Sequence, residues 1–465
     1  MCVLLKLCSL LPIFLTTVTA LNNTLLTNRT FASQACINGT ATQIDSTVVL
    51  GRKQQVVDEQ CVNQIYNDYS NDTHTDVKKV AQGTLNCTSL NLYPGMRTFN
   101  VSVQNMTFRG TQSSFEDINH RFVWNGYLDN RGGQMSVVWD AICNASVFQL
   151  DITLLASKNG TQTVLTTRPC INSTVVNCLW TVQATSEVRP QEPPLQTKLN
   201  TTELDKDIHH LNGDRFRRRL DNNQVLMHSG RKLDDGSVIK MLYLYSTATK
   251  ARYGDATIKS MIASAHTSTN QALADSGLSF RVQLLDSFVI NNAGDDMVGA
   301  LSDLVNGNVP DVHLLRNIYH ADIVQLIVED GSFCGYSYLM TSPSTNFEKY
   351  GYNVIYSGCL TQYSSTHEWG HVNGLDHDRP DASGSTIYNY GVGYRMCNDG
   401  SSAPSNGAIP FFRSVMSYPC ANSVRVPIFS GPYVKFQNTV AGDFNTNNQY
   451  VLQQTHNTVA NFRIG

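Results

Sequence analysis

The segment 366–378, with the sequence THEWGHVNGLDHD, constrains this chain more than any other. His367 and His371 are four residues apart, so on a helix their imidazoles leave the same face and can reach one metal ion. Gly374 can adopt a positive φ at little cost, which lets the chain leave the helix sharply and bring His377 back as a third ligand. Three neutral imidazoles leave one coordination position open for water. The spacing therefore predicts a catalytic rather than a structural zinc site.

Glu368 follows the first of these histidines and can act on the attacking water rather than bind the metal, which predicts a general base. A HExxH pattern alone is a weak signal, because helices with two histidines and a glutamate occur without metal. The glycine and the third histidine at fixed offsets make a chance match rarer than roughly one in a thousand. The competing interpretation is a solvated helix that happens to be rich in histidine.

A second segment, Arg413–Pro419 with the sequence RSVMSYP, follows downstream. Met416 alone would more often be an ordinary core residue. The two segments together resemble the metzincin clan of zinc endopeptidases, in which a tight turn presents a methionine beneath the zinc ligands. The resemblance implies an α/β catalytic domain with an active-site helix, a Met-turn at Met416 and one catalytic zinc ion.

Two residues beside these motifs refine the resemblance. Asp378, directly after the third histidine, is similar to the aspartate that bonds into the Met-turn region in the reprolysin-like (adamalysin) group. Tyr418, two places after the methionine, departs from that group. It is similar to the tyrosine that ligates zinc or donates to the oxyanion in astacins and serralysins, and is a candidate for either role.

The whole C-terminal half, roughly residues 238–465, also resembles the reprolysin-like peptidyl-Asp metalloendopeptidases. The segments that carry this resemblance are DIVQLIVEDGSFCGYSYLM, HEWGHVNGLDHDR, RSVMSYPC, IFSGPYV and VANFR. The resemblance implies a preference for cutting before acidic residues, for which Arg413 and Arg425 are candidate basic groups. A weaker resemblance, from FVWNGYL to LTTR, is to the pro-segment of the same enzymes.

Hydrophobic periodicity in residues 237–465 predicts strands that alternate with helices, and therefore a mixed, mostly parallel twisted sheet covered by helices. Helices are expected at 255–275, 297–305 and 311–320, and strands at 240–245, 278–290, 322–328, 332–340 and 353–357. The strand at 332–340 is expected at the sheet edge beside the cleft. An extended substrate would add to that edge as a further strand.

The N-terminal half, residues 21–184, predicts a different kind of domain. It carries N-x-Ser/Thr triplets throughout, one further triplet follows at Asn200 beyond it, and we find none after residue 202, which indicates a glycosylated, water-facing N-terminal half made by eukaryotic secretion. The acceptors are Asn22, Asn28, Asn38, Asn71, Asn86, Asn100, Asn105, Asn144, Asn159, Asn172 and Asn200. Short alternating apolar runs between Phe122 and Thr167 predict an antiparallel sheet or a small sandwich.

Cysteine usage indicates an oxidising compartment, because the number beyond the leader is even. In the C-terminal half we predict the pairs Cys334–Cys359 and Cys397–Cys420, whose members are close in sequence and flank the site. Connectivity stays open for the six cysteines of the N-terminal half, Cys36, Cys61, Cys87, Cys143, Cys170 and Cys178. No odd thiol is evident that would block the zinc, so latency is expected from other contacts.

Two further segments predict processing. Residues 1–20 combine Lys6, an apolar run interrupted by Pro12 and small residues before Ala20, which is typical of a signal peptide rather than of a membrane span. Residues 185–236 lose all periodicity, as a linker does. The linker contains a basic cluster that matches a furin-like convertase site, although a solvated charge run is the alternative: Arg215, Arg217, Arg218 and Arg219.

Together these features predict a mainly β, disulfide-bonded, glycosylated pro-domain followed by an α/β metzincin catalytic domain. The expected product is a secreted, extracellular zymogen that acts on proteins or peptides, with its own pro-domain as inhibitor and a furin-like convertase as processing partner. A net charge of −3 without a basic run gives no indication of nucleic acid. Two alternatives stay open: an inactive homologue, which would usually have lost Glu368 or a ligand, and an adhesion or binding glycoprotein.

Overall fold

The fold is known from a computed structural model. It describes residues 43–44, 75–85, 96–103, 106–128, 133–142, 144–154, 162–169, 178–186, 195–196, 235–291, 296–384, 386–397, 411–420 and 423–464. Several sequence-predicted features lie outside these residues: the signal peptide at 1–20, the basic residues Arg215, Arg217, Arg218 and Arg219, the acceptors Asn22, Asn28, Asn38, Asn71, Asn86, Asn105, Asn159, Asn172 and Asn200, the cysteines Cys36, Cys61, Cys87, Cys143 and Cys170, and the side chain of Cys178.

The N-terminal half forms a nine-stranded sheet in the order β1-β3-β4-β5-β6-β7-β8-β9-β2. Neighbouring strands are antiparallel, except that β1 runs parallel to β3. The strands are β1 (Gln43–Ile44), β2 (Thr75–Thr84), β3 (Thr98–Val103), β4 (Met106–Ile118), β5 (Arg121–Leu128), β6 (Gly133–Asp140), β7 (Gln149–Leu154), β8 (Gln162–Pro169) and β9 (Cys178–Ser186). From β3 to β9 the spatial order follows the sequence, as hairpin connections produce.

Four of these strands, β5 to β8, lie where alternating apolar runs predicted them. The other strands were not expected. β4, with the sequence MTFRGTQSSFEDI, explains why: it is long but mostly polar, so it lacks the period-two hydrophobic pattern. The sheet still has a core of its own around Trp124 and Phe99, whose rings lie 5.6 Å apart. The buried Trp124 Nε1 donates to the carbonyl oxygen of Met96 at 2.9 Å.

The C-terminal half contains a six-stranded sheet in the order β10-β14-β15-β13-β11-β12. β11, β12, β13 and β15 are parallel, while β14 is antiparallel to β15, so the sheet is mixed and mostly parallel, as the sequence predicted. The strands are β10 (Leu195–Gln196), β11 (Val238–Ser246), β12 (Arg281–Ile290), β13 (Ile323–Val328), β14 (Gly335–Leu339) and β15 (Tyr352–Tyr356).

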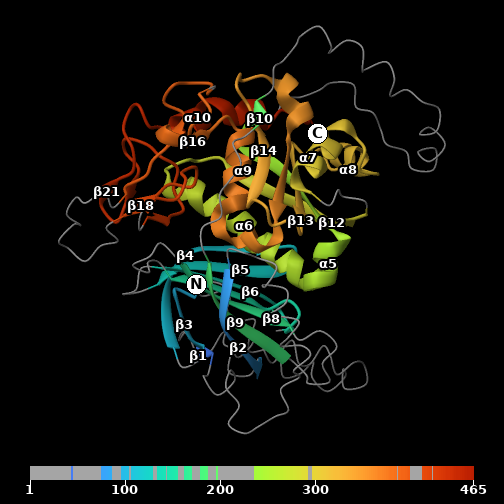
Figure 1. The fold of residues 1–465 in the computed structure, drawn as a ribbon, viewed down its shortest axis with the longest axis vertical. Coiled ribbons are helices and arrows are strands. Elements are labelled where there is room, and N and C mark those ends of the chain that lie inside the picture. The colour runs from blue at the N-terminus through green and yellow to red at the C-terminus, as the bar shows by residue number, and fades with distance from the viewer. Residues whose placement is uncertain are drawn as a thin grey trace, which may run out of the picture.

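Helices cover both faces of this sheet because successive residues of its central strands point to opposite sides. Met241 and Tyr243 of β11 face the core shared with α6 and α9, whereas Leu242 and Leu244 face the core shared with α7 and α8. The helices are α5 (Thr247–Tyr253), α6 (Asp255–Asp275), α7 (Met297–Asn306), α8 (Val312–Ile318), α9 (Ser365–Val372) and α10 (Asn448–Val459). The layers are visible in the upper part of Figure 1.

Short elements complete the C-terminal half. They are the helical turns η3 (Thr345–Tyr350), η4 (Ser357–Cys359), η5 (Leu360–Ser364) and η6 (Arg379–Asp381), and the strands β16 (Asp376–Asp378), β17 (Val392–Gly393), β18 (Phe412–Arg413), β19 (Val424–Arg425), β20 (Lys435–Phe436) and β21 (Thr439–Val440). β16 pairs with β17, and β18 pairs with β19. β16 carries the last residues of the histidine motif, and the β18–β19 pair follows this motif in sequence.

β10 comes from the segment that the sequence predicted as a linker without structure. Its two residues pair in parallel with β14, Leu195 opposite Tyr338 and Gln196 opposite Leu339. The strand at the expected substrate edge is therefore covered by a stretch of the N-terminal half of the chain. Two paired residues are too few to leave a periodic signal in the sequence, which is why periodicity missed this strand.

The N-terminal sheet docks on α6, which lies between the two sheets in Figure 1. Ile118, Val123 and Val138 of the N-terminal sheet form a small apolar cluster with Ala263 of α6, and Leu284 of β12 packs against it. Ser136 of the sheet and Ser264 of α6 share a hydrogen bond of 2.6 Å. The helix is consequently buried on both sides, although its hydroxyl-rich sequence has only a weak amphipathic pattern.

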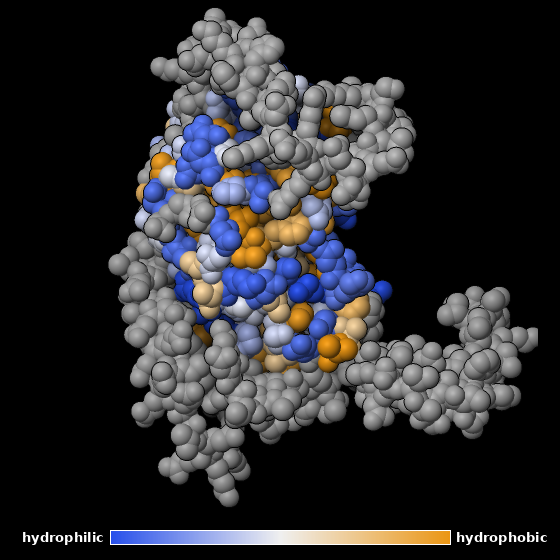
Figure 2. Space-filling model, turned by 90° about the vertical axis from the view of Figure 1, so that its right-hand side faces the viewer, coloured by the Kyte–Doolittle hydropathy of each residue, from blue (hydrophilic) through white to orange (hydrophobic). Residues whose placement is uncertain are grey.

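The face of the molecule in Figure 2 carries polar side chains with apolar side chains exposed between them. No helix in the described parts of the chain is long and apolar enough to cross a membrane.

Candidate metal centre

The helix α9 and the turn after it build the site. Gly374 adopts a φ of +87°, and the chain turns there with Gly374 N donating to the carbonyl oxygen of His371 at 2.9 Å. Leu375 N donates to the carbonyl oxygen of Gly370 at 3.0 Å. These two hydrogen bonds end the helix and direct the chain into β16, which carries the third histidine of the motif.

The structure brings His367, His371 and His377 together. Their Nε2 atoms form a nearly equilateral triangle, with separations of 3.0 Å between 367 and 371 and 3.1 Å for the other two pairs. All three side chains are buried, at 0%, 1% and 0% exposure. In the described parts of the chain, this is the group of histidines and acidic or sulfur ligands that can hold a metal ion.

The other nitrogen of each ring contacts a backbone carbonyl. His367 Nδ1 lies 2.9 Å from the oxygen of Val415, His371 Nδ1 lies 2.7 Å from that of Leu375, and His377 Nδ1 lies 3.4 Å from that of Asp381. A carbonyl can only accept, so Nδ1 carries the proton and each Nε2 presents a lone pair. Three lone pairs that converge without a proton between them repel one another unless a cation lies there. The donor set therefore fits zinc.

Electrostatics keep the imidazoles neutral, as metal ligands must be. Burial lowers the pKa of His371 to about 4, with the charge of Asp376 opposing the shift. Burial, reinforced by the neighbouring histidines, holds the pKa of His367 and of His377 well below the usual range. The three rings are therefore neutral near neutral pH, each with its single proton on Nδ1.

The Glu368 side chain points from α9 toward the strand β14. Its Oε2 accepts a hydrogen bond from Ser337 Oγ at 2.9 Å. Gly335 makes room for it, because a Cβ added there would lie 2.5 Å from both Cγ and Oε1 of the glutamate. Burial raises the pKa of Glu368 to about 8, while the Ser337 hydrogen bond and the charge of Arg425 oppose the shift. A carboxyl group with such a pKa can both accept and return a proton near neutral pH.

Met416 lies beneath the ligands in a tight turn, where Ser417 N donates to the carbonyl oxygen of Ser414 at 3.1 Å. The Met416 side chain is fully buried. Gly370 of the active-site helix lets it approach, since an added Cβ would lie 2.5 Å from the methionine sulfur. The preceding residue, Val415, supplies the carbonyl that orients His367.

Asp378 connects the third histidine to this turn. Its Oδ1 accepts a hydrogen bond from Tyr418 N at 2.8 Å, and its Oδ2 forms an ion pair of 2.8 Å with Arg395 Nε. Arg395 also pairs with Asp381, the residue whose carbonyl faces His377. The Tyr418 ring lies against His377, with centroids 4.2 Å apart.

The two candidate arginines lie in the paired strands β18 and β19, and both are buried. Arg413 Nη1 donates to the carbonyl oxygen of Ser417 at 2.8 Å, so it supports the methionine turn. Arg425 lies nearer the reactive groups: burial lowers its pKa to about 10, while the charges of Glu368 and Tyr418 act in the opposite direction. Arg425 therefore places a positive charge inside the site.

Both predicted disulfides of this half are present, Cys334–Cys359 and Cys397–Cys420. The first ties the residue before β14 to the end of η4, beside the edge strand. The second ties the segment after β17 to the segment after the methionine turn. Both hold elements that flank the three histidines.

Comparison with known proteins agrees with this geometry. Residues 239–425 match the Reprolysin_5 profile of metallo-peptidase family M12. This segment is a reprolysin-like M12 metallopeptidase domain. The peptidyl-Asp metalloendopeptidase of Stenotrophomonas maltophilia (strain K279a) is 28% identical over 49% of this chain and 53% of its own length. That of Xanthomonas campestris pv. campestris is 29% identical over 34% of this chain and 35% of its own length. The chain thus spans about half the length, or less, of these curated relatives.

Among solved structures, metalloproteinase-II from Bacteroides fragilis aligns at 9% identity over 60% of this chain and 81% of that one. The TM-score is 0.35, a level at which no fold relationship is inferred.

Several residues of the metallopeptidase domain that shape the site were missed by sequence reasoning. Ser337 and Gly335 reach Glu368 from β14, and Arg395 reaches Asp378 from the segment after β17. Asp376, whose Oδ1 accepts from His377 N at 2.8 Å, was also missed. Only Gly370 left a usable signal, because a glycine inside a helical metal motif indicates a close approach by another segment.

Proposed function

We propose that the protein is a secreted zinc endopeptidase, made as a zymogen, that hydrolyses peptide bonds of extracellular proteins. The single observation that supports this best is the triangle of three Nε2 lone pairs with the Glu368 carboxyl group beside it. A structural zinc site would need a fourth protein ligand, whereas three ligands leave room for substrate and water. The family match and the similarity to peptidyl-Asp metalloendopeptidases support the same activity.

Bound zinc would polarise the scissile carbonyl and make a water molecule acidic near neutral pH. His367, His371 and His377 would hold the ion, with their Nδ1 protons fixed by backbone carbonyls. Glu368 takes a proton from the attacking water and returns it to the leaving amine. Asp378 holds the Tyr418 backbone, and the Tyr418 hydroxyl is our candidate donor to the developing oxyanion.

Glu368→Gln tests the proposal, because it removes the base and leaves the three ligands. The purified variant should keep stoichiometric zinc by mass spectrometry of metals. It should lose at least about 10²-fold in cleavage of a denatured proteome. Glu348→Gln, a glutamate that pairs with Arg463 away from the site, is the matched control and should cleave like the wild type. Cleavage by Glu368→Gln at the wild-type rate contradicts the assignment, and a zinc-loaded wild type that cleaves nothing favours an inactive homologue.

We further propose that the N-terminal half keeps the enzyme latent until the linker is cut at Arg215–Arg219 by a furin-like convertase. The pairing of β10 with β14 supports this, because β14 is the strand to which an extended substrate would add. A chain with Arg218 and Arg219 both changed to alanine should stay as one uncut species and remain inactive. Full activity of that uncut chain would refute latency.

A preference for acidic side chains is the substrate class that we propose. The relatives are named peptidyl-Asp endopeptidases, and the buried positive charge of Arg425 beside Glu368 supports the same preference here. Two peptides that differ only by aspartate against asparagine after the scissile bond provide the test. Arg425→Gln should reduce cleavage of the aspartate peptide about 10- to 100-fold more than cleavage of the asparagine peptide, because one charge-assisted hydrogen bond is lost. The effect of the lost charge on Glu368 acts on both peptides alike. An equal loss for both peptides would contradict this role.

A further inference from the structure

The turn η5, immediately before the metal-binding helix, is held in an unfavourable backbone conformation. Tyr363 adopts a φ of +63°, and Gln362 before it is also non-helical, with φ −107° and ψ 30°. A positive φ is costly for a bulky side chain and persists only where surrounding contacts fix it. Two residues later α9 begins, so the direction in which the turn leaves determines where the helix with His367 and Glu368 starts.

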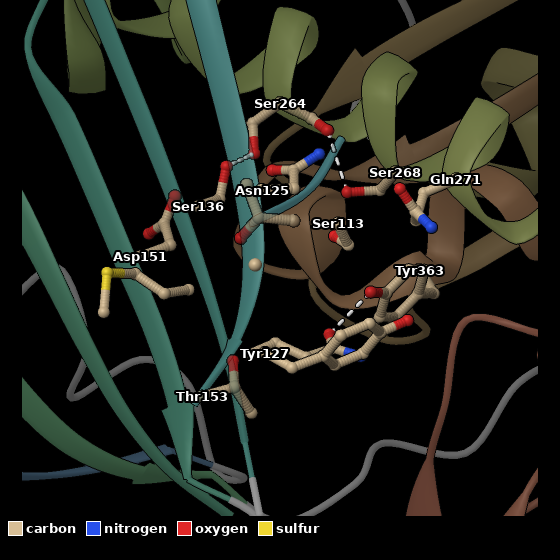
Figure 3. Close-up of a pocket in the computed structure, with 14 residues that line it drawn as sticks. Ser113, Asn125, Tyr127, Ser136, Asp151, Thr153, Ser264, Ser268, Gln271 and Tyr363 are labelled. Carbon is tan, nitrogen blue, oxygen red and sulfur yellow. Dashed lines mark hydrogen bonds between the residues drawn. The ribbon is translucent and has the colours of Figure 1, made fainter. Parts of the chain in front are cut away.

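The turn packs against α6 and α9, and its side-chain hydrogen bond through Tyr363 comes from the N-terminal half of the chain. Tyr363 Oη donates to Gln134 Oε1 of β6 at 2.5 Å, across a separation of 229 residues in sequence. Close by, Tyr127 Oη donates to Asp275 Oδ2 at 2.5 Å. Figure 3 shows Tyr363 and Tyr127 side by side in the cavity between the N-terminal sheet and α6. This cavity, of about 30 Å³, has room for about two water molecules.

The same turn contacts the active site on its other side. The carbonyl oxygen of Gln362 accepts from Arg425 Nη1 at 3.4 Å. Arg425 is the buried cation that acts on Glu368 and that we assign to acidic substrates. A continuous path therefore runs from Gln134 through Tyr363 and the Gln362 carbonyl to Arg425.

We propose that the N-terminal sheet is a positioning part of the active centre, in which Gln134 holds Tyr363 and thereby the Arg425 guanidinium. Tyr363 and Gln134 are positioning residues, since neither touches the substrate. The inference rests on the proposed function for its kinetic consequence and extends it, because it gives the sheet a role that is separate from inhibition. Within the N-terminal half we assign the proposed inhibition to β10, whose pairing with β14 covers only two residues.

Positioning requires the sheet to remain bound once the linker is cut. Its contacts with the catalytic half are numerous enough for that: the apolar cluster with Ala263, the Ser136–Ser264 and Tyr127–Asp275 hydrogen bonds, and Arg168 Nη2 donating to Tyr253 Oη at 3.3 Å. After cleavage in 215–219, the two chains should elute together from a native sizing column. Separation of the chains with activity retained would overturn the proposal.

The hydrogen bond itself is tested in the cut, two-chain protein by Tyr363→Phe and Gln134→Leu. Ser136→Ala is the matched control, because it removes a hydrogen bond of the same interface that does not reach the turn. Amide hydrogen exchange in residues 360–366 should accelerate about five- to tenfold in both test variants, the factor of one net hydrogen bond, and should stay at the wild-type rate in the control. In the double variant, exchange should be no faster than in either single variant, since each single change already removes the same hydrogen bond.

Kinetics distinguish positioning from a purely structural role. In the test variants the KM for the aspartate peptide should rise about five- to tenfold, with kcat for the asparagine peptide within about twofold of wild type. Equal losses for both peptides, or variants that behave like Ser136→Ala in exchange and kinetics, would overturn the proposal. The exchange measurement needs no peptidase activity, so a wild type that cleaves nothing refutes the proposed function alone.

Discussion

At the scale of single residues, the site depends on small side chains that leave space. Gly370 leaves room for the sulfur of Met416, and Gly335 leaves room for the Glu368 carboxylate. Ser337, also from β14, supplies the hydrogen bond that orients this carboxylate. The chemistry of Glu368 therefore depends on two neighbours that lie more than thirty residues before it.

Gly335→Ala should displace the general base. The added Cβ would meet Cγ and Oε1 of Glu368 at 2.5 Å, so the carboxylate must move. We expect kcat to fall about 10²-fold, the effect of misplacing a reacting group by about 1 Å, while zinc stays bound. Gly299→Ala on α7, where the new Cβ meets only the side chain of Asp296, is the control. Peptide cleavage and zinc content measured on both variants decide the matter, and an unimpaired Gly335→Ala enzyme would contradict the geometry.

Ser337→Ala should change the pH profile. The serine donates to Glu368 and so lowers the pKa of that carboxyl group against the effect of burial. Without this hydrogen bond the charged form is less stable and the pKa rises. The limb of kcat/KM on which activity increases as Glu368 loses its proton should therefore move to higher pH. An unchanged limb would show that Ser337 does not act on the base.

At the scale of elements, a disulfide anchors the short strand β14 beside the site. β14 has five residues, and Cys334 immediately before it is tied to Cys359 of η4. The bridge anchors the strand that carries Gly335 and Ser337, and so it anchors the surroundings of Glu368.

Replacing both Cys334 and Cys359 by serine should destabilise the domain. The bridge closes a loop with a sequence separation of 25, for which the chain-entropy relation gives about 3.5 kcal/mol. Denaturant unfolding of the double variant should show this loss in the free energy of unfolding. The single Cys359→Ser variant also loses the bridge, so a loss in the free energy of unfolding equal to that of the double variant assigns the effect to the bridge rather than to the second substitution.

At the scale of the whole molecule, the chain ends of the catalytic half converge on one buried carboxylate. Asp322 accepts from Lys240 N at 2.8 Å through Oδ2 and from Arg463 N at 3.1 Å through Oδ1. It thus joins the start of β13, strand β11 and the segment after α10. Burial raises its pKa to about 7, although these hydrogen bonds and the nearby charges of Lys240 and Arg316 oppose the shift.

This carboxyl group should make stability depend on pH. Its pKa in the folded protein lies above the ordinary value of 3.8, so between about pH 4 and 7 the folded state binds a proton that the unfolded state has lost. The contribution of Asp322 to the free energy of unfolding is therefore fully present at low pH and is lost as pH rises from about 4 through 7. In that range the free energy of unfolding falls by up to about 1.4 kcal/mol per pH unit. Subtracting the pH profile of Asp322→Asn from that of the wild type should isolate this slope in denaturant unfolding. A difference that does not vary with pH would contradict the raised pKa.

The sequence by itself determined the local chemistry. His367, His371 and Glu368 are set by helical spacing, and Gly374 and His377 follow at fixed offsets, so a few consecutive residues specify the group that the structure assembles. The alternation of strand-like and helix-like segments along residues 237–465 also predicted the mixed, mostly parallel sheet, because hydrophobic periodicity distinguishes the two kinds of element.

Only the tertiary structure decided what those residues meet. Three sets of contacts join segments far apart in sequence: Gly335 and Ser337 beside Glu368, β10 on the strand β14, and Gln134 on the Tyr363 turn. Such contacts leave no periodic trace in either segment, since each partner is an ordinary strand or turn residue until the chain folds. The physical reason is that spacing along the chain fixes neighbours only within one element, whereas packing between elements fixes the rest.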